Sequence, residues 1–134
     1  MSEYLFAYGT LQPGFAPTKI ARVAAKLRPV GEGSVRGTLY DLGGYPGAVA
    51  DPNAKGGIIG TVMELPEDEG LLARLDAYEG FYPRAPETSE YIREKQVVEL
   101  KVGGAVECWF YRYNRKPRDA DRVESGEWGK SSGQ

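Results

Sequence analysis

The chain contains no histidine and only one cysteine, Cys108. The lack of histidine excludes Ser-His-Asp and Cys-His catalysis, and nearly every zinc or iron site that needs imidazole. A single cysteine leaves no intrachain disulfide and no cysteine-rich metal site. Any acid–base chemistry must therefore come from carboxylates, lysine, tyrosine or the backbone.

Long apolar runs and an excess of charge of one sign are also missing. No segment approaches the roughly 18 apolar residues of a membrane span, and residues 1–9 lack the basic start of a signal peptide. The net charge is −2, which predicts neither a nucleic-acid footprint nor a polybasic membrane patch. We expect a cytoplasmic protein with no nucleic-acid or membrane partner.

Glycine and proline are abundant, with 18 and 9 copies among 134 residues. This composition favours turns and short strands over a helix bundle. The length predicts one domain, over residues 1–128, followed by a polar tail over 129–134 that we expect to be disordered.

Hydrophobic patterning predicts the order strand, helix, two strands, helix and a hairpin. The predicted strands cover residues 4–9, 35–42, 58–65, 91–102 and 105–113, and the predicted helices cover residues 18–27 and 67–78. Residues 10–14 and 43–47 are predicted loops, because they are rich in glycine and proline. This order lacks regular strand–helix–strand alternation, so the fold class is α+β with a curved or closed sheet.

The second predicted helix carries a carboxyl group at an unusual position. Its apolar stripe contains Leu71, Leu72 and Leu75, and Glu79 lies only about 20° from Leu72 around the helix axis. Asp76 lies nearer the edge of that stripe. Burial and the negative end of the helix dipole should both raise the pKa of Glu79, as general acid–base catalysis requires. The alternative is a side chain that turns outward to solvent as the last turn frays.

Two glycine-containing segments are candidates for ligand contact. The strand that ends at Gly9 can expose backbone N–H groups as a cradle for an anion or oxyanion. In the segment 43–47, glycines let the backbone approach a ligand beside the ring of Tyr45. The alternative for each segment, and the one favoured when it is taken alone, is an ordinary turn. Cys108 is expected to be a buried small hydrophobic residue, since it has no histidine partner.

Taken together, these motifs resemble the gamma-glutamylcyclotransferase-like superfamily, and within it the AIG2-like branch that includes gamma-glutamylamine cyclotransferases. The resemblance runs from about Tyr4 to Trp128. It is carried by Tyr8-Gly9-Thr10-Leu11, Gly44-Tyr45-Pro46-Gly47, Leu75-Asp76-Ala77-Tyr78-Glu79-Gly80 and Ser125-Gly126-Glu127-Trp128.

The resemblance implies a small mixed β-barrel with two or more flanking helices and a cavity at one barrel mouth. It also implies a cofactor-independent and metal-independent reaction, in which the α-amine of a γ-glutamyl group attacks its own γ-carbonyl and releases 5-oxoproline. Glu79 matches the catalytic acid–base. The matched substrate-binding positions are Tyr8, Gly9, Thr10, Leu11, Gly44, Tyr45 and Tyr113. The expected partner is a small γ-glutamyl substrate. A non-catalytic ligand-binding or regulatory module, or another Glu-dependent transferase or lyase, remains an alternative on the same barrel.

Overall fold

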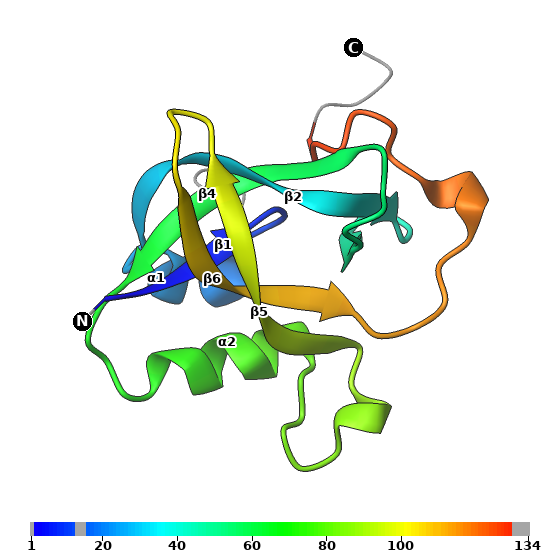
Figure 1. Cartoon of the computed structure of the whole chain (residues 1–134). Coiled ribbons are helices and arrows are strands. Elements are labelled where there is room, and N and C mark those ends of the chain that lie inside the picture. The colour runs from blue at the N-terminus through cyan, green and yellow to red at the C-terminus, as the bar shows by residue number, and fades with distance from the viewer. Residues whose placement is uncertain (1, 13–15, 130–134) are drawn as a thin grey trace.

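A computed structural model describes residues 2–12 and 16–129. Its elements follow the order strand, helix, three strands, helix and a final pair of strands (Figure 1). The strands are β1 (Glu3–Ala7), β2 (Arg28–Asp41), β3 (Pro46–Ala50), β4 (Gly57–Leu65), β5 (Tyr91–Leu100) and β6 (Ala105–Tyr113). The helices are α1 (Thr18–Ala24) and α2 (Leu71–Glu79), with short 3-10 turns at Pro86–Thr88 and Asp119–Asp121.

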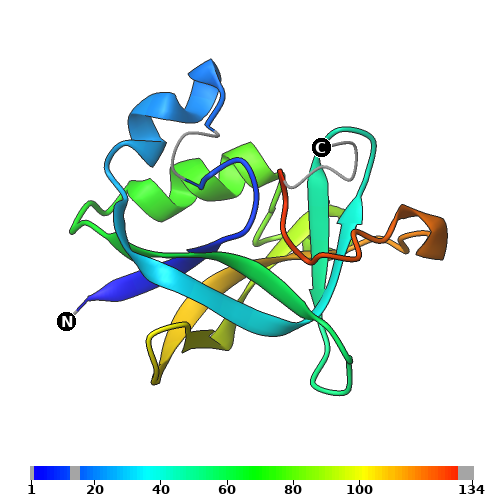
Figure 2. The same cartoon turned by 90° about the horizontal axis from the view of Figure 1, so that it is seen from above.

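Five strands close into a mixed barrel. The sheet order is β3-β2-β4-β1-β6-β5, and a further pairing of β2 with β5 joins the two sides. The β1–β6 pair is parallel and the other pairs are antiparallel. Strand β3 extends the sheet outside the closed circuit, along the far half of β2 (Figure 2). This architecture confirms the predicted α+β class and small mixed barrel.

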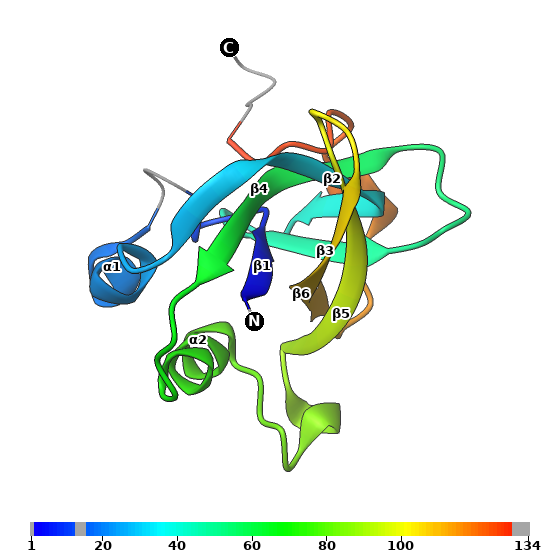
Figure 3. The same ribbon diagram turned by 60° about the vertical axis from the view of Figure 1, so that its left-hand side comes forward.

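Strand β1 is buried on both faces from Leu5 to Ala7, which is why these residues are all apolar. Phe6 points into the barrel with Val62 and Phe110, whereas Leu5 packs on the opposite face with Leu75 of α2. The two helices cover this second face, on one flank of the barrel (Figure 3). A strand buried on both faces has no polar alternation, which explains the continuous apolar run.

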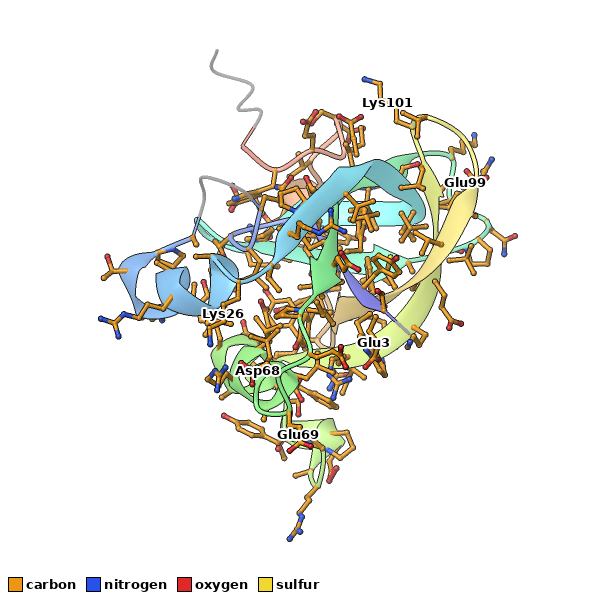
Figure 4. The ribbon with its side chains drawn as sticks, turned by 90° about the vertical axis from the view of Figure 1, so that its left-hand side faces the viewer. Glu3, Lys26, Asp68, Glu69, Glu99 and Lys101 are labelled. Atoms are coloured by element: carbon orange, nitrogen blue, oxygen red, sulfur yellow. The ribbon has the colours of Figure 1, made fainter. Side chains whose placement is uncertain are left out.

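Two predicted helix boundaries are wrong. Helix α1 ends at Ala24 rather than at residue 27, and α2 begins at Leu71 rather than at residue 67. Before α2, the Asp68 side chain accepts a hydrogen bond from Gly70 N–H at 3.1 Å, forming a local turn that competes with helix. The acidic residues therefore precede α2, whose first turn contains none. Figure 4 shows Lys26 beside Asp68, an ion pair of 3.3 Å that links the ends of the two helices.

Several strand boundaries also differ from the predictions. Strand β3 starts inside the predicted loop 43–47, and it pairs with β2 from Asp41↔Pro46 to Gly37↔Ala50. Proline is tolerated as the first residue of a strand at a sheet edge. Strand β2 begins at Arg28 rather than 35, through a glycine-rich stretch with a register shift between Pro29 and Gly31.

The predicted β5–β6 hairpin is confirmed, although β5 ends at Leu100. The turn contains Gly103 and Gly104, both with positive φ. Of the predicted loop 10–14, residues 13 and 14 lie outside the described residues, as do residues 130–134 of the predicted tail. Within residues 2–12 and 16–129, no helix has the length and apolar character needed to cross a membrane.

Candidate active site

A cavity of about 320 Å³ lies where the ends of β1 and α2 meet the starts of β3 and β5. Six of the predicted site residues line it together: Tyr8, Gly9, Thr10, Leu11, Tyr45 and Glu79. The remaining lining residues are Phe6, Ala7, Lys19, Pro46, Tyr78, Glu90, Tyr91 and Tyr111. The volume is at the small end of the range for small-molecule sites.

The loop after β1 forms one wall of the cavity. It passes so close to β3 that a Cβ atom on Gly9 would come within 2.5 Å of Pro46 Cγ, which requires glycine there. The Thr10 hydroxyl shares a hydrogen bond of 2.8 Å with the Tyr78 hydroxyl. Among the described residues, the backbone N–H groups of Thr10 and Leu11 have no acceptor. The loop therefore has two donors available to an anion or oxyanion.

Glu79 is the last residue of α2, and its position is fixed by the helix before it and by the glycine after it. Leu71 and Leu75 anchor the helix in the core between helices and barrel. Gly80 then ends the helix in a left-handed conformation, with φ of 70°. Glu79 is half-buried and lines the cavity. Its carboxyl group makes no hydrogen bond or ion pair within residues 2–12 and 16–129.

The tyrosine hydroxyls around Glu79 donate to other acceptors. Tyr8 donates to the Tyr111 carbonyl at 2.6 Å, and Tyr91 donates to the Pro46 carbonyl. The Tyr111 hydroxyl donates to Asp76 Oδ1 at 2.8 Å. Burial and the nearby Glu79 charge both contribute to raising the pKa of these three phenols. These three hydroxyls therefore stay protonated, and each donates its hydrogen to an acceptor other than Glu79.

The two neighbouring carboxylates also have partners. Asp76 is 6% exposed, and it receives Arg93 Nε at 2.7 Å and Arg93 Nη2 at 3.1 Å. It is thus deeply buried, although the sequence places it nearer the edge of the apolar stripe, and the guanidinium and the Tyr111 hydroxyl compensate its charge. Glu90 accepts a hydrogen bond of 2.9 Å from the Tyr45 hydroxyl.

Burial, then the Glu90 and Asp76 charges, raise the pKa of Glu79 to about 8. The direction agrees with the sequence prediction, and so does burial as the main cause. The two carboxylates are further causes that the sequence analysis did not include. A carboxyl group with this pKa exchanges protons near neutral pH, which suits a general acid–base.

Gly44 and Tyr113 do not line this cavity. The Gly44 N–H donates to Asp41 Oδ1 at 2.8 Å, and the Tyr113 ring lies edge-on to Tyr91 at 5.7 Å between centroids. Gly44 borders a separate, more open groove of about 1080 Å³, formed with the segment from Arg118 to Gly129. Glu79 is not part of that groove, so we place the candidate active site in the smaller cavity.

Cys108 is completely buried, as predicted, and burial raises the pKa of its thiol to about 11. Among the described residues, no three carboxylate or thiol side chains come together closely enough to hold a metal ion.

Sequence reasoning missed Glu90, Lys19 and the two strand tyrosines of the cavity, Tyr91 and Tyr111. Glu90 has no local pattern, since it precedes β5 and meets Tyr45 only through the fold. The tyrosines read as ordinary strand aromatics. The predicted two-residue turn at 103–104 would pair Val102 with Ala105, whereas the observed register pairs Glu99 with Ala105 and Arg93 with Tyr111. Neither register reveals that Asp76 lies opposite Tyr111.

Residues 5–130 match the family model described as "Gamma-glutamyl cyclotransferase, AIG2-like". A Vibrio cholerae protein named "Putative gamma-glutamylcyclotransferase" is 31% identical over 96% of each chain. The Escherichia coli "Gamma-glutamylcyclotransferase family protein YtfP" is 36% identical over a matched segment that makes up 67% of this chain and 66% of that protein.

Solved structures share the fold. A Mus musculus AIG2-like protein superposes with a TM-score of 0.72 at 22% identity, covering 95% of this chain and 88% of the mouse chain. YkqA of Bacillus subtilis gives 0.70 at 25% identity over 96% of this chain, which spans only 40% of YkqA. The chain therefore belongs to the AIG2-like gamma-glutamyl cyclotransferase family.

Proposed function

We propose that the protein is a gamma-glutamyl cyclotransferase in which Glu79 is the general acid–base. The main support is the state of the Glu79 carboxyl group. It borders the cavity and has no partner among the described residues, whereas the neighbouring carboxylates of Asp76 and Glu90 are both paired. A half-buried carboxyl group kept only for stability would be expected to have a hydrogen-bond partner, since removing a polar group from water without one costs free energy.

In the proposed reaction, the Glu79 carboxylate takes a proton from the α-ammonium group of the substrate. The freed amine nitrogen attacks the γ-carbonyl carbon, and the new C–N bond closes a five-membered ring. The bond from that carbon to the leaving nitrogen then breaks as this nitrogen receives the proton from Glu79. The ring nitrogen still carries a second hydrogen, which moves as a proton through the regenerated Glu79 carboxylate to the released amine. The products are 5-oxoproline and a free amine, and Glu79 returns to its starting state.

The pKa of Glu79 matches this task. An α-ammonium group at a peptide N-terminus has a pKa of about 8, and the free α-carboxylate of a γ-glutamyl group raises the pKa of its own amine above that value. The pKa of Glu79, about 8, is much closer to it than the ordinary carboxyl value of 4.5. Proton exchange between the two groups therefore costs little free energy in either direction. Because the carboxylate is the form that accepts the proton, kcat/KM should rise with pH up to about 8.

The loop after β1 supplies the positioning. The N–H groups of Thr10 and Leu11, which have no acceptor among the described residues, can bind the oxyanion that develops on the γ-carbonyl oxygen or the anionic end of the glutamyl group. Holding the amine against the carbonyl makes the intramolecular attack far more frequent. Tyr45 and Glu90, bonded to each other, border the same cavity.

Release of 5-oxoproline from a panel of γ-glutamyl compounds tests the reaction. The panel contains γ-glutamyl amino acids, γ-glutamyl-ε-lysine, γ-glutamyl alkylamines and glutathione. We expect turnover of at least one class by the wild type and by Glu69→Gln, which removes an exposed carboxyl outside the cavity. Ligand binding without any 5-oxoproline would instead support a non-catalytic binding module.

A further inference from the structure

Among the described residues that line the cavity, Lys19 has the one cationic side chain, and the proposed mechanism gives it no role so far. Three of these described residues carry a formal charge: Glu79, Glu90 and Lys19. Lys19 is an exposed residue of α1, and its ammonium group pairs with no carboxylate in the described part of the chain. Lys26, just after the same helix, differs in that it pairs with Asp68.

The Lys19 ammonium group is placed beside the loop after β1. It lies over the Tyr78 ring, with Nζ 5.5 Å from the ring centroid, a distance at which a cation is attracted to the ring face. The Tyr78 hydroxyl is in turn bonded to Thr10 of that loop. The Lys19 ammonium group, the Tyr78 side chain and the Thr10 hydroxyl therefore form a continuous chain of contacts along this wall of the cavity.

A γ-glutamyl group has one fixed anion, its α-carboxylate. Glu79 and Glu90 would repel that anion, whereas Lys19 and the loop N–H groups would attract it. We propose that Lys19 binds the α-carboxylate of the substrate, and this assignment rests on the proposed function. With the carboxylate at Lys19, the α-ammonium group on the same carbon is turned toward Glu79.

Lys19→Met tests the assignment, because it keeps most of the unbranched side chain and removes the charge. We expect KM for the γ-glutamyl substrate to rise about tenfold with kcat nearly unchanged, as for a contact made equally in ground and transition states. Lys19→Arg should restore most of the loss. Arg22→Met removes a cation from the same helix outside the cavity and should leave KM unchanged.

A ligand without the α-carboxylate separates a direct contact from a structural effect. Binding of a γ-glutamyl alkylamide and of the matching 4-aminobutanoyl alkylamide is measured by calorimetry in the non-reacting Glu79→Gln background. Lys19→Met should weaken binding of the first ligand about tenfold and leave the second unchanged. Equal weakening of both ligands, or no weakening of either, would overturn the assignment.

These measurements also distinguish a failure of the Lys19 assignment from a failure of the proposed function. If the wild type binds the γ-glutamyl amide through Lys19 but releases no 5-oxoproline, the proposed function fails and the Lys19 assignment stands. If 5-oxoproline is released and Lys19→Met has an unchanged KM, the assignment fails alone. Absence of both binding and turnover overturns both.

Discussion

Glu79 should make the protein less stable as pH rises, and Glu79→Gln should remove that effect. The pKa of this carboxyl group is about 8 in the folded chain, against an ordinary value of 4.5. The folded state therefore binds more protons than the unfolded state between these values, so the free energy of unfolding falls as pH increases through this window. Glutamine resembles the protonated side chain in shape and does not titrate.

From these two pKa values, the variant should gain at most about 4 kcal/mol over the wild type between pH 5 and pH 9. Urea unfolding of both proteins at pH 5, 7 and 9 measures the difference, and titration of all other groups cancels between them. Glu69→Gln is the matched control, because Glu69 is exposed just before α2 (Figure 4). A stability difference that does not change with pH would refute the burial argument.

Three further perturbations follow from the same site. Glu90→Gln removes a charge that raises the pKa of Glu79, so a carboxyl NMR titration should show Glu79 titrating at lower pH; an unchanged midpoint would exclude this coupling. Gly9→Ala has no room beside β3 and should lower kcat/KM at least about tenfold by displacing the loop; wild-type kinetics would contradict the close approach. Asp76→Asn leaves Arg93 unpaired and should cost about 3 kcal/mol in urea unfolding; a loss below 1 kcal/mol would show that the pair contributes little.

Much of the barrel could be predicted from local pattern. The apolar run of β1, the glycine turn between β5 and β6, and the left-handed Gly80 after α2 are each set by residues close in sequence. Strand β3 escaped prediction because its start, Pro46-Gly47, has the composition of a turn. There Gly47 passes against the Tyr113 ring, where a Cβ atom would lie 3.0 Å from Tyr113 Cγ. That contact depends on the closed sheet.

The candidate site was predictable only in part, for the same reason. Glu79 and the loop after β1 carry local signals, namely a carboxyl on an apolar stripe and a strand that ends in glycine. Glu90, just before β5, and Lys19 of α1 reach the cavity through the topology of the barrel. The hydrogen bonds that engage the tyrosine hydroxyls around Glu79 join residues far apart in the chain, such as Tyr8 and Tyr111. No sequence spacing encodes those pairings.

The most direct test of the account compares kcat for 5-oxoproline release by the wild type and Glu79→Gln, together with the dissociation constant for the same substrate. The account predicts that the variant binds nearly as tightly and loses at least about 100-fold in kcat, the usual contribution of a positioned acid–base. A variant that keeps wild-type kcat would contradict the central role given to Glu79.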